Sequence, residues 1–222
     1  MLSQFQILNS YHLKILALTT MILDHVGAMF FPDFLPLRII GRVAFILYAF
    51  MLVEGVNNTR NIKNYIQKIF IWALISEIPF DLAFYGKPFY FEHQNIFFTL
   101  LISILGLQFF QKSKSFFLSF IVGLVCLVVS YFFKFDYSWY GTSLIFAFYL
   151  FRKLNFFKFI FIETISTIAT FNVLGVQFFA FLGFIPIFLY NGKQGKKIGK
   201  IYYSFYAIHL LIFALIKYVT NV

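Results

Sequence analysis

The sequence predicts an all-α, polytopic integral membrane protein with about nine transmembrane helices, in a range of roughly 8–10, and a cytoplasmic N-terminus. Two features of composition lead to this class: hydrophobic residues make up 61% of the 222 positions, and charged residues only 12%. A soluble domain is about half apolar and roughly a quarter charged. The third feature is the placement of Lys and Arg, which alternates from loop to loop. Together they exclude a soluble enzyme, a disordered protein and a secreted disulfide scaffold.

Nine apolar segments approach the roughly 20 residues that a helix needs to cross a bilayer. In chain order they are 12–31, 36–56, 65–85, 95–111, 115–133, 138–151, 156–171, 176–190 and 200–220. The sixth and the eighth are short, which is why the count has a range. The first is not a cleavable signal peptide, because Asp24 and His25 interrupt its apolar core. Only short loops separate the segments, so we expect residues 1–222 to form a single transmembrane domain.

Basic residues gather in alternate loops of this nine-segment arrangement. The loops after segments two, four, six and eight hold twelve of the 18 Lys and Arg residues: Arg60, Lys63, Lys68, Lys112, Lys114, Arg152, Lys153, Lys158, Lys193, Lys196, Lys197 and Lys200. The opposite loops and the C-terminus hold Lys87, Lys134 and Lys217. Because Lys and Arg favour the cytoplasmic side, the N-terminus is predicted to be cytoplasmic and the C-terminus extracytoplasmic. The net charge of +10 is therefore a topology signal, and no nucleic-acid partner is predicted.

Ionisable side chains inside the predicted spans point to a functional site, since each costs about 2.5–3.5 kcal/mol on insertion scales. They are Lys14, Asp24, His25, Arg38, Arg42, Glu54, Glu77, Asp81, Glu163 and His209. Such groups usually face a cavity or one another. This set is too large for a passive anchor.

Depth along the helices sorts these residues into two levels. Asp24 and His25 lie about two turns before the outer turn 32–36, and Arg42 lies about two turns after it, so all three are roughly 10 Å below the outer surface. Polar residues of the third and fourth segments reach the same region: Glu77, Asp81, Asn95 and Thr99. Lys14 and Glu54 lie near the inner surface, where we expect them to pair.

Asp24 is not expected to orient His25, because adjacent helical residues do not face each other. Asp24 is expected to pair with Arg42 or Arg38, which lie on one face of the second segment. His25 can then turn toward a cavity, where a charge change near pH 7 suits proton transfer. A purely structural alternative stays open, in which ion pairs only hold three helices together.

His209 and Cys126 are interpreted as packing residues, and no metal site is expected. His209 lies among aromatic residues and is expected to be a hydrogen-bonded packing residue, with a role in the site as the alternative. The single Cys126 lies in an apolar run with no nearby base or cation to form a thiolate. No histidine pair has ligand spacing on one helix, so no metal is predicted.

Motifs in a fixed order run along nearly the whole chain: Leu13-Lys-Ile-Leu-Ala17, Met21-Ile-Leu-Asp-His-Val-Gly27, Leu37-Arg-Ile-Ile-Gly-Arg-Val-Ala-Phe45, Glu54-Gly55, Thr59-Arg60, Ser76-Glu-Ile-Pro-Phe80, Asn95-Ile-Phe-Phe-Thr99, Asp136-Tyr137 with Gly141, and Tyr206 with His209-Leu210. Their order and spacing resemble the TraX family of bacterial integral membrane proteins. One departure is Ile46-Leu47, where a proline often follows the phenylalanine.

The resemblance implies a bacterial inner-membrane acetyltransferase, because the family's founding activity is N-acetylation of a conjugative pilin at its amino terminus. More distantly, the family is similar to membrane acyltransferases of the acyltransferase-3 type, which carry a basic residue, ten intervening positions and a histidine on the first helix. Lys14 and His25 match that spacing. Lysine stands where arginine is usual, so the charge is kept but the bidentate fork is lost.

Chemistry and resemblance together predict transfer of an acetyl group from cytoplasmic acetyl-CoA to an extracytoplasmic amine or hydroxyl. His25 is the expected base, with Asp24 and Arg42 as catalytic partners, and Arg38, Arg42 or Asn95 would stabilise the oxyanion. The predicted donor- and substrate-binding residues are Lys14, Arg38, Glu54, Arg60, Glu77, Asn95, Thr99 and His209. Expected partners are the bilayer, acetyl-CoA and a pilin or cell-surface glycan. The alternatives are a small proton-coupled transporter or flippase and a membrane assembly protein.

Overall fold

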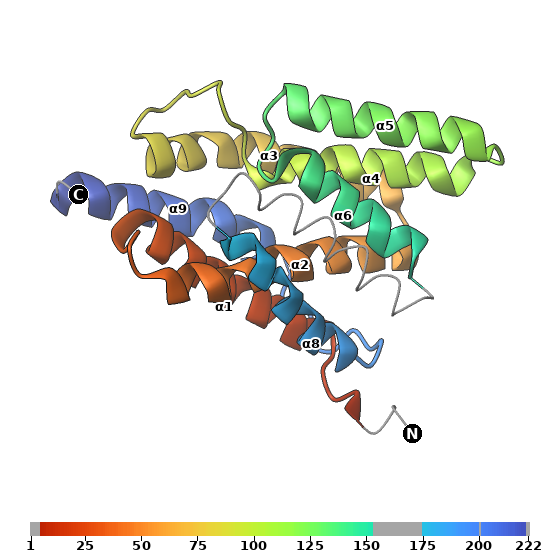
Figure 1. The fold of residues 1–222 in the computed structure, drawn as a ribbon, viewed down its shortest axis with the longest axis horizontal. Coiled ribbons are helices and arrows are strands. Elements are labelled where there is room, and N and C mark those ends of the chain that lie inside the picture. The colour runs from red at the N-terminus through yellow and green to blue at the C-terminus, as the bar shows by residue number, and fades with distance from the viewer. Residues whose placement is uncertain (1–4, 153–174, 200, 221–222) are drawn as a thin grey trace. The chain divides into compact units, whose positions relative to one another are not determined.

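The computed structural model describes residues 5–152, 175–199 and 201–220, and the regular elements in these ranges are helices (Figure 1). They are α1 (Ser10–Phe30), α2 (Leu35–Asn58), α3 (Ile62–Tyr85), α4 (Ile96–Lys112), α5 (Phe116–Phe132), α6 (Ser138–Leu150), the 3₁₀ helix η2 (Val176–Gly183), α8 (Phe184–Phe188) and α9 (Ile201–Thr220). In this part of the chain, strand-like pairing is limited to isolated bridges, Leu8 with Tyr190 and Gln94 with Phe135. The predicted all-α class is confirmed.

The predicted segment 156–171 lies outside the described residues, and the others except 176–190 coincide with single helices. Three of the described helices, α1, α2 and α9, are long and apolar enough to cross a membrane. Helices α4 and α5 have 17 residues each and α6 has 13. These lengths are below the roughly 20 residues of an upright span. Apolar helices of spanning length are therefore present among the described residues. Neither the predicted count of nine spans nor the predicted cytoplasmic N-terminus is supported by these helices.

The segment 176–190 differs most from its prediction, because it is not one continuous α-helix. It forms η2 followed by the five-residue α8. Pro186 is one physical reason, since proline has no N–H to donate and its ring disfavours a continuous helix. Gly183 at the junction packs closely on α2: a Cβ there would lie 2.7 Å from Cβ of Ile46. The break and the close contact together fix this segment against α2.

The helices pack as two compact units, one of Met1–Met51 with Phe151–Tyr202 and the other of Leu52–Leu150 with Tyr203–Val222. In the first unit, buried side chains at four-residue spacing join α1 to α2: Leu13, Ala17, Val43, Leu47 and Met51. Such spacing puts the side chains on one face of each helix. The segment before α1 is anchored by hydrogen bonds from Leu8 N to Leu189 O (2.9 Å) and from Asn191 N to Leu8 O (2.8 Å).

In the second unit, α4 packs against α3, α5 and α6. Helix α3 ends at Gly86, which has a positive φ of 67°, and α4 begins after Asn95, whose side chain accepts a hydrogen bond from Phe97 N. The loop between these helices pairs with the loop between α5 and α6. Gln94 N donates to Lys134 O at 3.1 Å, and Asp136 N donates to Gln94 O at 2.8 Å. This pairing brings polar residues of two loops together at one end of the unit.

Apolar side chains cover the exposed surface of α5: Phe116, Phe117, Leu118, Phe120, Ile121, Leu124, Val125, Val128, Tyr131 and Phe132. Large exposed apolar patches are rare on soluble monomers. In a bilayer the same side chains would lie against lipid tails. The surface of α5 therefore supports the membrane character that the composition predicts.

Candidate functional site

Asp24, on α1, binds two arginines of α2. Its Oδ1 lies 3.0 Å from Nη1 of Arg38 and accepts a hydrogen bond from Nη2 of Arg42. Nη1 of Arg38 also donates to the backbone oxygen of Asp24 at 3.0 Å. The arginines are four residues apart and so lie on one face of α2. The ion pairs predicted from the matching depths of these residues are confirmed.

A glycine provides the space for Asp24. A Cβ at position 41 would lie 2.3 Å from both Cβ and Oδ1 of Asp24. Nearer the turn that joins α1 to α2, a Cβ at Gly27 would lie 2.8 Å from Cβ of Leu37. Real Cβ atoms do not approach this closely, so α1 and α2 can pack at this distance only because both positions lack side chains. The two glycines therefore set the helix spacing on which the ion pairs depend.

The two guanidinium groups are not equally engaged. Arg42 also donates from Nη1 to Oε1 of Gln177 at 3.1 Å and from Nε to Arg38 O at 3.3 Å. The hydrogen bonds of Arg38 within the described residues use Nη1, which leaves Nε and Nη2 available. The side chain of Arg38 is 29% exposed, against 11% for that of Arg42. Arg38 is thus the arginine better placed to donate to a ligand.

His25 follows Asp24 on α1 and is partly buried. An α-helix has 3.6 residues per turn, so the two side chains project about 100° apart. Asp24 is committed to the arginines, and His25 leaves the helix in a different direction. An imidazole can act as a base, and a guanidinium can stabilise an oxyanion.

Lys14 and Glu54 belong to different units. Nζ of Lys14 lies over the ring of Tyr202, 5.5 Å from its centroid, in a cation–π arrangement. Glu54 is partly buried near the end of α2, and Arg60 is exposed in the turn before α3. The ion pair between Lys14 and Glu54 stays a prediction. Tyr202 is a partner of Lys14 that the sequence did not indicate.

A second group of polar residues lies in the second unit, where Asn95 joins α4 to α3. Nδ2 of Asn95 donates to Ala73 O at 2.8 Å and to Oε2 of Glu77. The backbone N of Asn95 also donates to Oε2 of Glu77, at 3.2 Å. Asn95 is fully buried. Because both side-chain N–H groups are used in these contacts, Asn95 positions Glu77 in this structure and does not present a donor for an oxyanion.

Asp136 connects the two polar loops of this unit. Its backbone oxygen accepts a hydrogen bond from the hydroxyl of Thr99, and its Oδ1 lies 3.6 Å from Nε2 of His93. Burial lowers the pKa of His93, but the ion pair with Asp136 and the charges of Glu77 and Asp81 outweigh it, so the pKa is raised from 6.5. His93 is therefore held as a cation to higher pH than an ordinary histidine.

His209 lies in an aromatic environment on α9 and is 5% exposed. Its Nδ1 is 2.7 Å from Phe205 O, one turn earlier on the same helix. Its ring contacts those of Phe205, Tyr206 and Phe213, with centroids 5.5–5.6 Å apart. These contacts fit the packing role expected for His209. Its predicted role in substrate binding stays a prediction.

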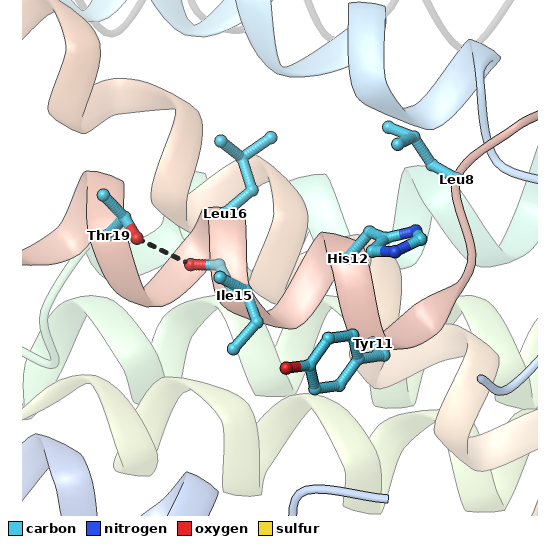
Figure 2. Close-up of a pocket in the computed structure, with 6 residues that line it drawn as sticks. All are labelled: Leu8, Tyr11, His12, Ile15, Leu16 and Thr19. Atoms are coloured by element: carbon cyan, nitrogen blue, oxygen red, sulfur yellow. Dashed lines mark hydrogen bonds between the residues drawn. The ribbon is translucent and has the colours of Figure 1, made fainter. Parts of the chain in front are cut away.

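An open pocket of about 350 Å³ lies along α1 (Figure 2). It is lined by Leu8, Tyr11, His12, Ile15, Leu16 and Thr19. Figure 2 shows the Thr19 hydroxyl directed at the carbonyl oxygen of Ile15, to which it donates at 3.0 Å. His12 forms a capping box with Asn9, with distances of 3.2 and 3.3 Å. No predicted site residue lines this pocket.

The residues that sequence reasoning missed lie mostly in loops. No motif or spacing in the sequence pointed to His93 or to Gln177. Asp136 belongs to one of the quoted motifs, which is the signal that points to it. Within the described ranges, no group of three His, Cys, Asp or Glu side chains could hold a metal ion.

The family comparison covers most of the chain, including the residues around Asp24 and those around Asn95 and Asp136. The model of the TraX protein family matches residues 10–217. The chain belongs to the TraX family. The recognition made from the motifs is therefore confirmed, whereas similarity to acyltransferase-3 enzymes is not shown.

A curated relative of this TraX-family chain is a probable fimbrial assembly protein, FimC of serogroup H1, from Dichelobacter nodosus. The two are 30% identical over 111 residues. The match covers 45% of this chain and 46% of the relative, so the chain spans less than half of the relative's length. No solved structure matches the chain.

Proposed function

We propose that this TraX-family chain is a membrane-embedded acyltransferase that moves an acetyl group from cytoplasmic acetyl-CoA to an extracytoplasmic acceptor. The acceptor would be an amine or hydroxyl, of a pilin N-terminus or a cell-envelope glycan. The observation that carries the proposal is the Asp24–Arg38–Arg42 cluster beside His25 on a spanning helix. It is supported by family membership and by the name of the fimbrial assembly relative.

The proposed topology is nine spans in the bacterial inner membrane with the N-terminus in the cytoplasm. It rests on the distribution of Lys and Arg, twelve of which share one side. The donor then enters from the basic side, where Lys14, Arg60 and Lys63 would meet its phosphates. His25 and the arginine cluster lie nearer the opposite surface, where the acceptor arrives. Spans of 13–17 residues require a locally thinned bilayer, snorkelling of flanking side chains or packing against other helices.

In the proposed reaction, His25 takes the proton of the acceptor N–H or O–H as the acceptor attacks the acetyl carbonyl. Arg38 donates to the oxygen that becomes negative. The C–S bond then breaks, and the proton passes from His25 to the departing thiolate. Direct transfer is favoured over a cysteine acyl-enzyme, because Cys126 is 4% exposed and burial leaves no thiolate to attack.

The second candidate, a membrane assembly protein without enzymatic activity, is favoured by the name of the relative. A proton-coupled transporter or flippase would use the same buried charges as a proton pathway. Purified protein in liposomes with radiolabelled acetyl-CoA separates the three. Release or transfer of acetate that depends on His25 supports the acyltransferase. Proton flux without acetate release supports the transporter, and neither signal supports the assembly protein.

A further inference from the structure

The open pocket along α1 is a groove on an exposed face of a helix of spanning length. Its residues on α1 recur at spacings of three and four from Tyr11 to Thr19, so they share one face of the helix. Ile15, in the middle of this face, is 41% exposed. Another face of α1 buries Leu13 and Ala17 against α2. Within the described residues, the face with the pocket, here called the α1 groove, is therefore the one available to lipid tails.

The α1 groove is apolar along its length. Its aliphatic walls come from Leu8, Ile15 and Leu16. The hydroxyl of Thr19 donates to Ile15 O, so it adds no free donor to the groove (Figure 2). From Tyr11 to Thr19 the helix rises about 12 Å. One leaflet of a bilayer contains roughly 15 Å of hydrocarbon. The length and the lining of the groove therefore suit one acyl chain.

The loop 190–199 lies against the end of α1 at which the groove begins. Tyr190 pairs with Leu8, a residue of the groove, and the Tyr190 hydroxyl lies 3.1 Å from Oγ of Ser10. Ser10 N donates a hydrogen bond to Lys193 O at 2.8 Å. All of these residues belong to the first compact unit. Their contacts fix the loop beside the mouth of the groove.

This loop carries positive charge without a carboxylate partner among the described residues. Lys193, Lys196 and Lys197 are exposed. Residues 1–23 and 175–199, which form this end of the unit, contain no Asp or Glu. The ion pairs within the described ranges do not include these lysines. The loop and the groove together therefore match a ligand with an anionic head and an apolar tail.

We propose that the α1 groove and the lysines of this loop form a binding site for an anionic phospholipid. One acyl chain lies in the groove, and the phosphate lies among Lys193, Lys196 and Lys197, whose ammonium groups donate to its oxygens. Lysines beside a spanning helix attract anionic headgroups. A soluble phosphorylated ligand would use the lysines but not an apolar groove on a lipid-accessible face. The site stands on the contacts of the first unit and does not rest on the proposed function.

The probes are phosphatidylglycerol and phosphatidylcholine with the same photoreactive diazirine in one acyl chain, so they differ in headgroup charge. Each is added as a minor component to phosphatidylcholine nanodiscs that hold the wild-type protein, and labelled peptides are identified by mass spectrometry after irradiation. A lysine near an anionic headgroup strengthens binding about fivefold. Phosphatidylglycerol should therefore label residues 8–19 at least tenfold more than phosphatidylcholine does, whereas the exposed side of α5 should be labelled equally by both.

Two outcomes with the wild-type protein would overturn the site. Equal labelling of residues 8–19 by the two probes would show ordinary surrounding lipid without a preference for the anionic headgroup. Labelling of residues 8–19 far below that of α5 with both probes would show that a protein helix covers the groove.

Variants then locate the headgroup and the chain. The triple variant Lys193→Gln, Lys196→Gln, Lys197→Gln changes only exposed side chains and should lower labelling by phosphatidylglycerol to the phosphatidylcholine level. The matched control is Lys112→Gln with Lys114→Gln, a basic pair between α4 and α5 that should label as the parent does. Ile15→Trp should fold, because position 15 is exposed, and should reduce labelling by filling the groove.

Unchanged labelling in the triple variant would refute the headgroup assignment. Acetyl-CoA is added to the wild-type protein as a competitor. Labelling that stays constant supports a lipid site, whereas its loss would assign the lysines to a soluble phosphorylated ligand and overturn the proposal.

Discussion

The carboxylate of Asp24 on α1 is hydrogen-bonded to the guanidinium of Arg42 on α2. Arg38 approaches the same carboxylate oxygen at 3.0 Å. One carboxylate therefore contacts two guanidinium groups within a helix pair of spanning length. Ionisable groups in a bilayer are costly, so they pair with one another or mark a functional site. The contact of Asp24 with Arg42 is thus the feature that the packing of α1 against α2 and the proposed site share.

Breaking this pair from either side should destabilise the protein. Asp24→Asn and Arg42→Gln should each cost about 3–5 kcal/mol, because a buried charge is left without its partner. The double variant should recover much of the stability but not the activity. Unfolding in detergent, followed by circular dichroism, measures each value. Single variants as stable as the parent would show that the pair does not hold the helices together.

Replacing Gly41 by alanine should disturb the same pair without changing any charge. The new Cβ would lie 2.3 Å from Asp24, and relieving that overlap should cost about 1–3 kcal/mol, or more if the ion pair breaks. Gly123→Ala is the matched control, because a Cβ there would lie 3.4 Å from Phe110, an ordinary contact. Comparing the melting temperatures of the two variants tests this. Equal melting temperatures would contradict the close packing of α1 and α2.

The success and failure of the sequence predictions have physical causes. The short turn 31–34 joins two long helices, so equal distances from the turn place Asp24 and Arg42 at one depth. The pair was therefore predictable from spacing alone. Partners from distant segments were not: Gln177 reaches Arg42, and Tyr202 lies under Lys14. Neither contact follows from the period of a single helix.

Loop geometry was the least predictable part of the candidate site. His93 and Asp136 meet because Gln94 pairs with Phe135 through backbone hydrogen bonds, which carry no side-chain pattern. The capping hydrogen bond of Asn95 and its hydrogen bond to Ala73 O depend on where α4 begins, and its predicted contact with substrate stays a prediction. Helix ends are the elements that apolar patterns define least well. The contacts of these polar loop residues could therefore be identified only from the structure.

The pairing of His93 with Asp136 should make stability depend on pH. The pKa of His93 is raised in the folded protein, so the pair stabilises fully below the unfolded value of 6.5 and is lost as the pH rises through the folded value. Because the pair is partly exposed, the effect should be a few tenths to about 1 kcal/mol. The melting temperature should fall over this range in the parent and less in His93→Gln. Identical pH profiles would rule out the pair as the cause.

The proposed orientation predicts opposite labelling of two single cysteines. Asn58 lies at the basic end of α2, and Thr220 is exposed at the end of α9. Asn58→Cys should react with an impermeant maleimide only after the inner membrane is opened, and Thr220→Cys should react in intact cells with a permeable outer membrane. Cys126 is buried, and a Cys126→Ser background removes its signal. Labelling of both positions from the same side would exclude the nine-span arrangement.

The last prediction concerns His25 as the base of acetyl transfer. A positioned base contributes about 10²–10⁴-fold, so His25→Gln should lose activity by this factor while the protein inserts and folds normally. Asp24 does not depend on the imidazole for its ion pairs, which is why the fold should survive. The matched control is His12→Gln on the same helix, because glutamine can replace His12 in the capping box. The measurement is acetyl transfer from radiolabelled acetyl-CoA by purified protein in liposomes, alongside donor binding.

The outcomes of this experiment distinguish a base from a ligand contact. Loss of turnover with unchanged donor binding supports His25 as the base, and loss of donor binding would make it a contact to acetyl-CoA. His209→Ala should cost less than His25→Gln, since the ring of His209 is held by Phe205 and its aromatic neighbours. A folded His25→Gln protein with near-parental turnover would remove His25 from the mechanism. The base would then have to be sought at His209 or Glu77, two other titratable groups on predicted spans.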